Sequence, residues 1–313
     1  MCESDVTLEI ATETSPALPP ARGPQGGLAL AMSAMFLMTA LSAHGQADEE
    51  GRSRNQPIPP FRIIGNIYYI GASDVTSFLI TTPKGHILLD GGYKETAPQI
   101  EANVATLGFH LEDVKILLNS HAHLDHAGGL AELKQKTAAK LMMMENDAEL
   151  LARGGKDDFY FGDRLAFPAA SANRVLHDGN KVELGGVTMT AHLTPGHTKG
   201  CTSWTTQVTE NDRQYDVVFI GSTSVPGYTL LGNPKYPAMK NDYAKAFALL
   251  KTLPCDVFLA AYGSFFSLRE KSARRAEAGG ANPFIDPEGY RTFLEKSEHA
   301  FREQLEREEK AAQ

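Results

Sequence analysis

Residues 119–129 read NSHAHLDHAGG and carry the strongest chemical signal in the chain. Four side chains that can bind a metal, His121, His123, Asp125 and His126, fall directly after the apolar run 114–118, which is typical of a buried strand. A loop at the end of such a strand can bring these side chains to one point. Imidazole suits zinc, and a carboxylate adds a charged ligand. The spacing therefore predicts a metal site on a loop.

A fifth candidate ligand, His197, lies in TPGHT (194–198), again at the end of a predicted strand. A single histidine after a Pro-Gly turn is weak evidence and is more often structural. Together with the first cluster, however, His197 becomes the natural fifth ligand.

The elements around these motifs follow an order of strands and then a helix, twice over. Hydrophobic spacing predicts helices at 96–107, 128–137, 242–253 and 287–312, the last capped by Asp286. Strands are predicted at 67–70, 77–81, 86–89, 114–119, 140–144, 182–184, 187–193, 202–208, 216–220 and 257–261. Two sheets packed face to face with helices outside would accommodate this order, although spacing alone also permits other mixed α/β layouts.

Composition excludes several classes of protein. The chain has 313 residues, 42% of them hydrophobic, and a formal net charge of -8. No stretch rich in Lys and Arg indicates nucleic-acid binding. The three cysteines, Cys2, Cys201 and Cys255, form neither a disulfide scaffold nor a zinc-finger pattern.

The N-terminal segment differs from the rest of the chain. Residues 28–41 (LALAMSAMFLMTAL) are apolar or small, too few to span a bilayer and typical of the core of a secretory leader. We expect a leader over residues 1–47, a single catalytic domain over 48–313, and a periplasmic or secreted mature protein without a membrane segment. The acidic residues upstream of this core indicate a start later than Met1 or an atypical leader, and a disordered apolar tail is the alternative to a leader. Nothing in the sequence demands more than a monomer.

Together these segments resemble the metallo-β-lactamase superfamily. The resemblance rests on HxHxDH at 121–126, TPGHT at 194–198 and a strand that ends in LLDGG at 88–92. It implies an αβ/βα four-layer sandwich, in which two mixed sheets are flanked by helices. The motif is specific for the fold but not for the substrate.

One branch, the third subclass of the metallo-β-lactamases, is more similar still. The segments that carry this likeness are 80–92, 197–204, 221–228, 253–257 and 263–266. Many hydrolases of the superfamily have Gly-Asp, whose carboxylate bridges two metals, where this chain has Gly221 and Ser222. Because serine cannot supply that carboxylate, the pair favours a lactamase over a lactone or thiolester hydrolase.

The resemblance implies one or two zinc ions per chain. His121, His123 and His197 would hold the first, and Asp125 with His126 the second. A metal-bound hydroxide would then attack the amide carbonyl of a small-molecule β-lactam.

Three further positions are implied by the resemblance. Ser222 and Ser224 match serines that bind the substrate carboxylate, unless they are ordinary loop hydroxyls. Tyr262 stands where the family has a histidine ligand, so the second site is either weakened or completed by a phenolate. Asp125 and Tyr262 are also candidate catalytic residues.

Three functions therefore remain open at this point. The first is zinc-dependent hydrolysis of the β-lactam ring amide. The second is a related metallohydrolase of lactones or esters, and the third is a weakly active or non-catalytic metal-binding homologue.

Overall fold

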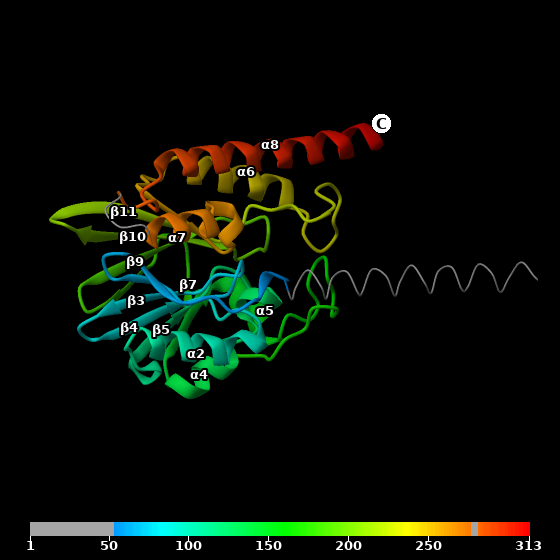
Figure 1. Cartoon of the computed structure of the whole chain (residues 1–313). Coiled ribbons are helices and arrows are strands. Elements are labelled where there is room, and N and C mark those ends of the chain that lie inside the picture. Colours follow the sequence, from blue (N-terminus) through cyan, green and yellow to red (C-terminus); the bar gives the residue numbers. More distant parts are fainter. Residues whose placement is uncertain (1–52, 277–280) are drawn as a thin grey trace, which may run out of the picture. The chain divides into compact units, whose positions relative to one another are not determined.

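Two mixed β-sheets pack face to face at the centre of the structure, a computed structural model that describes residues 53–276 and 281–313 (Figure 1). The first sheet has seven strands in the order of the chain: β1 (Phe61–Ile64), β2 (Ile67–Tyr69), β3 (Phe78–Thr82), β4 (Gly85–Leu89), β5 (Val114–Leu118), β6 (Lys140–Met144) and β7 (Arg174–Leu176). The second has five in the order β12-β11-β10-β9-β8: β8 (Lys181–Leu184), β9 (Val187–Leu193), β10 (Thr202–Glu210), β11 (Arg213–Ile220) and β12 (Val257–Ala260).

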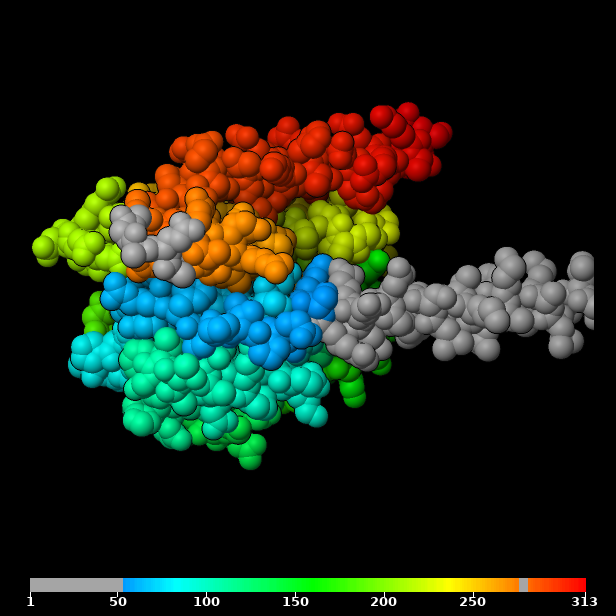
Figure 2. Space-filling model, viewed as in Figure 1, coloured from blue at the N-terminus to red at the C-terminus, as the bar shows by residue number. Residues whose placement is uncertain are grey.

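Helices cover the outer face of each sheet. On the side of the first sheet lie α2 (Ala97–Thr106), α4 (Leu130–Thr137) and α5 (Glu145–Ala152). On the side of the second lie α6 (Met239–Leu250), α7 (Leu268–Ala276) and α8 (Pro287–Ala311). Figure 2 shows the C-terminal helices in orange and red and the α2–α4 region in teal on opposite sides of the strands. The predicted four-layer αβ/βα class is confirmed.

Alternating residues of the first sheet supply two separate hydrophobic cores. In β5, Ile116 and Leu118 face the second sheet, whereas Leu117 faces the helices. β3 behaves in the same way, with Phe78 toward the second sheet and Leu79 toward the helices. Because both faces of these strands are buried, their sequences read as continuous apolar runs. This packing fixes the strand ends from which the candidate site is built.

The chain departs from the predicted elements in a few places. β1, β7, α5 and α7 are present but were not predicted, since short edge strands and polar helices leave little periodic signal. The segment that we expected to be a metal-binding loop is partly helical. Asp125 and His126 lie on the one-turn helix α3 (Leu124–Ala127). The predicted cap of α8 is confirmed: Asp286 accepts a hydrogen bond of 2.8 Å from the backbone N–H of Gly289.

The predicted leader, residues 1–47, lies outside the described residues. Across residues 53–276 and 281–313, no helix has the length and apolarity needed to cross a bilayer. Cys201 and Cys255 are both free thiols.

Candidate metal centre

The candidate site residues come from segments that follow β5, β9, β11 and β12 at one end of the two sheets. Two hydrogen bonds join the segment after β5 to the start of β10, the strand that directly follows the loop of His197. The indole N–H of Trp204 donates to the backbone oxygen of Asn119 at 3.1 Å, and the backbone N–H of Thr202 donates to that of Ser120 at 2.7 Å. Asn119 and Trp204, 85 positions apart in the sequence, are thereby held in contact.

Three histidines form a first group. His121, His123 and His197 are buried, and one ring nitrogen from each lies within 4.8 Å of the others. His123 Nδ1 lies 3.1 Å from His197 Nε2. Burial, together with the neighbouring histidines, lowers the pKa of His121 well below its usual value and that of His197 to about 3. These two rings are therefore neutral at pH 7, the state that a metal requires.

The outward nitrogens of two of these rings are held by the protein. Ser120 Oγ lies 3.1 Å from His121 Nδ1, while the backbone oxygen and Oγ of Ser224 lie 3.0 and 3.2 Å from His197 Nδ1. The opposite nitrogen of His121, Nε2, is buried and has no hydrogen-bond partner within the described part of the chain. Buried nitrogens rarely lack a partner, so this arrangement fits a zinc ion held by three imidazoles.

A second group shares His121 and adds Asp125 and His126. Asp125 Oδ2 lies 3.3 Å from His126 Nε2, and Asp90 Oδ2 lies 3.6 Å from His126 Nδ1. Burial alone would lower the pKa of His126, but the carboxylates of Asp125 and Asp90 raise it to about 10. Burial would likewise raise the pKa of Asp125, but His126 and Tyr262 hold it well below its usual range. Without a metal, His126 and Asp125 therefore form an ion pair.

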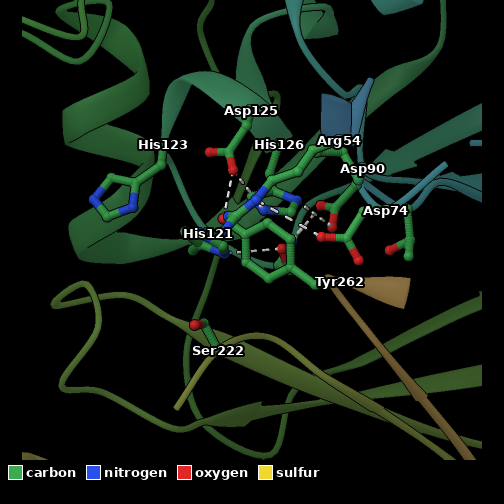
Figure 3. A network of polar contacts seen from close by, with 12 residues as sticks. Arg54, Asp74, Asp90, His121, His123, Asp125, His126, Ser222 and Tyr262 are labelled. Atoms are coloured by element: carbon green, nitrogen blue, oxygen red, sulfur yellow. Dashed lines mark hydrogen bonds and ion pairs between the residues drawn. The ribbon is translucent and has the colours of Figure 1, made fainter. Parts of the chain in front are cut away.

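Tyr262 lies directly against the second group (Figure 3). Its hydroxyl donates to Asp125 Oδ2, and its ring meets that of His126 edge-on with centroids 4.8 Å apart. Burial and the adjacent Asp125 raise the pKa of Tyr262 well above its usual value. The phenol therefore keeps its proton here and acts as a donor to Asp125.

Two buried acids that sequence reasoning missed support the ligand loops. Asp90, at a positive φ of 67°, accepts hydrogen bonds from the backbone N–H of Ser120 (2.6 Å) and from Asn119 Nδ2 (2.8 Å). Its place in the LLDGG segment was the available signal.

Asp147 of α5 is the other supporting acid. It accepts from the backbone N–H of Ala122 at 2.8 Å, the Thr198 hydroxyl at 2.7 Å and the backbone N–H of Gly200 at 2.7 Å. One side chain thus ties the loop of His121 and His123 to the loop of His197. No sequence motif marks this acid.

The two serines lie beside the first group. Ser222 is 2% exposed, and its Oγ lies 3.1 Å from that of Ser224. Ser224 is partly exposed and contacts His197 as described above. The structure thus brings all the predicted site residues together at one end of the sheets, and their functional roles stay predictions.

Comparison with known proteins places this geometry in context. The family model "Metallo-beta-lactamase superfamily" matches residues 70–262. The FEZ-1 metallo-beta-lactamase from Legionella gormanii is 43% identical, with a TM-score of 0.80, over 82% of this chain and 98% of that chain. BJP-1, a subclass B3 metallo-beta-lactamase of Bradyrhizobium japonicum, is 38% identical with a TM-score of 0.78, over 83% and 98% of the two chains.

Curated relatives match over shorter spans. A protein named as a probable metallo-hydrolase from Burkholderia pseudomallei (strain 1710b) is 31% identical over 41% of this chain and 43% of its own length. The N-acyl homoserine lactonase AttM of Azorhizobium caulinodans is 27% identical over 49% of this chain and 70% of its own length. The chain covers half or less of the first curated relatives that it matches, at 43% and 50% of their lengths.

Proposed function

The chain belongs to the metallo-beta-lactamase superfamily and is a zinc hydrolase, and from this premise we propose that it hydrolyses the ring amide of β-lactam antibiotics. The observation that carries the proposal is the likeness to subclass B3 β-lactamases over 98% of their own chains. Ser222 in place of a metal-bridging carboxylate points the same way.

The residues of the first group would hold one zinc ion. His121 Nε2, His123 Nδ1 and His197 Nε2 are the nitrogens that face one another, while Ser120 and Ser224 keep two of the rings in place. When bound, zinc supplies Lewis acidity that turns water into a nucleophile near neutral pH. Asp125 lies next to this group, and its Oδ2 already accepts a hydrogen bond from the Tyr262 hydroxyl, so it can accept one from a water beside the first group as well.

The second group would hold zinc more weakly. Asp125 Oδ2 faces His126 Nε2 and is also the oxygen to which Tyr262 donates. A second ion at this oxygen must compete with that hydrogen bond. Tyr262 adds a further ligand only if it gives up its proton, which its burial opposes. We infer one tightly held zinc, with Asp125, His126 and water around a weaker second position.

Ser222 and Ser224 would receive the carboxylate of the substrate, because they lie beside His197 on the segment after β11. The localisation inferred from residues 28–41, periplasmic or secreted, and a monomeric state belong to the same proposal.

The test is turnover of a chromogenic cephalosporin, measured with bound zinc per chain before and after a chelator. We expect turnover that the chelator abolishes and added zinc restores. The Azorhizobium lactonase makes homoserine-lactone hydrolysis the second candidate. If the protein hydrolysed the lactone but not the cephalosporin, a lactone would be its substrate in place of a β-lactam. If the protein showed no turnover and bound no zinc, it would be a non-catalytic homologue.

A further inference from the structure

A buried acid outside both ligand groups, Asp158, faces His123, the histidine of the first group whose outward nitrogen contacts neither Ser120 nor Ser224. Asp158 is 4% exposed and lies in the segment between α5 and β7. Its Oδ2 lies 3.8 Å from His123 Nε2. Both atoms are buried and lack a hydrogen-bond partner within the described residues. The distance exceeds that of a hydrogen bond, so in this structure the two groups face each other as an ion-pair contact.

The two nitrogens of the His123 ring face different neighbours, one in the first ligand group and the other at Asp158. Its Nδ1 lies 3.1 Å from His197 Nε2, inside the first group, and its Nε2 points to Asp158. A neutral imidazole carries one proton, so Nδ1 can bind a metal only when the proton is on Nε2. A carboxylate opposite Nε2 accepts that proton in a hydrogen bond and favours this tautomer. Carboxylate partners of this kind orient histidines that bind metals and raise their basicity.

The same carboxylate also organises the adjoining loop. Its Oδ1 accepts hydrogen bonds from the backbone N–H groups of Tyr160 (2.8 Å) and Phe161 (2.7 Å). Phe161 then packs edge-on against the His123 ring, with centroids 5.3 Å apart.

The neighbouring rings fasten this turn to the segment after β11. Phe159 and Tyr160 both pack on Tyr228, at centroid distances of 5.0 and 4.8 Å. One oxygen of Asp158 thus serves the aromatic turn 159–161, while the other serves a candidate ligand.

We propose that Asp158 is a positioning residue that holds His123 with Nδ1 toward the metal and couples metal binding to the order of the turn 159–161. The inference rests on the proposed function, because it takes His123 as a zinc ligand. It adds a residue outside the ligand set and a physical link between the metal and the aromatic turn 159–161.

The sharpest variant is Asp158→Asn. The amide oxygen can still accept from Tyr160 and Phe161, but the amide nitrogen that then faces His123 Nε2 is a donor. It favours the tautomer with the proton on Nδ1, which blocks ligation. We expect zinc affinity, measured by competition with a chromophoric chelator, to fall about 10- to 100-fold. The matched control is Asp157→Asn, whose exposed side chain pairs with Lys235, and its zinc affinity should equal that of the parent.

Hydrogen exchange tests the coupling. In the parent, removal of zinc should speed exchange of the Tyr160 and Phe161 amides, and in Asp158→Asn zinc should no longer slow it at concentrations that saturate the parent. Equal zinc affinity in Asp158→Asn and the parent would overturn the positioning role. Amide exchange that is indifferent to zinc in the parent would overturn the coupling.

Two further readouts separate the possible failures. A parent that binds no zinc defeats the proposed function itself, whereas a zinc-binding, active parent with an unaffected Asp158→Asn defeats only this inference. If Asp158→Asn does not fold, ¹⁵N-labelled histidine in the parent gives the answer directly. The zinc-loaded parent should show a slowly exchanging proton on His123 Nε2, and a freely exchanging one would refute the hydrogen bond.

Discussion

The two ligand groups share His121, yet they differ in charge and in protonation. In the first, burial and neighbouring histidines lower the pKa values of His121 and His197, so both rings are neutral at pH 7. In the second, carboxylates raise the pKa of His126 to about 10, so its ring is an imidazolium ion paired with Asp125. The first group is ready for a metal, whereas the second must first release a proton.

Tyr262 widens this difference. Its hydroxyl donates to the same oxygen of Asp125 that faces His126. A metal at the second group therefore displaces a proton from His126 and disturbs a buried hydrogen bond. Two neighbouring groups built partly from one loop should consequently fill at different zinc concentrations.

The largest effect should follow from His197→Ala, which removes a ligand from the first group only. We expect bound zinc to fall below one ion per chain. Cephalosporin turnover should fall by more than the roughly 100-fold expected when a residue that only hydrogen-bonds to a metal ligand is lost. The matched control is His299→Ala, an exposed histidine on α8 that pairs with Glu303. If His197→Ala kept full zinc and full turnover, the first group would not be the primary site.

Zinc uptake should depend on pH in different ways at the two groups. At the first, affinity should change little between pH 6 and 8, because the pKa of His197 is about 3 and its ring is already neutral. At the second, each ion displaces the proton of His126, whose pKa is about 10. Affinity there should rise about tenfold per pH unit below that value.

Calorimetric titrations of zinc at pH 6, 7 and 8, repeated in buffers of different ionisation enthalpy, measure this directly. The weaker binding step should release about one more proton than the tighter step. Equal proton release in both steps would show that the two groups do not differ in protonation before zinc binds.

Tyr262→His should reduce the difference in zinc affinity between the two groups. The substitution replaces a buried phenol with a neutral imidazole, a better zinc ligand, and frees Asp125 Oδ2. We expect the weaker zinc affinity to rise about 10-fold or more, the size expected for a change in the surroundings of a metal site. Tyr262→Phe is the control, because it frees Asp125 without adding a ligand, and it should give a smaller gain. Two tight zinc ions in the unmodified protein would refute a weakened second group.

The sequence was informative where the chemistry is concentrated in a short segment. The HxHxDH spacing and TPGHT placed five candidate ligands, and the structure brings them together. Asp147 and Asp158 could not be found in this way, because each is a single acid in a long chain and acts only through contacts made on folding. Likewise, the one turn of α3 is too short to show a period, so Asp125 and His126 were expected on a loop.

The smallest effect on metal binding should come from Ser224→Ala, which separates support of the metal from contact with the substrate. His197 Nδ1 lies 3.0 Å from the backbone oxygen of Ser224 and 3.2 Å from its hydroxyl, so the carbonyl alone can keep the ring in place. Zinc affinity should therefore stay within about twofold of the parent, a loss below 0.5 kcal/mol. If the hydroxyl binds the substrate carboxylate, KM should rise about 10-fold with little change in kcat, as expected for lost ground-state binding. A fall in zinc affinity with unchanged KM would instead assign Ser224 to the first ligand group alone.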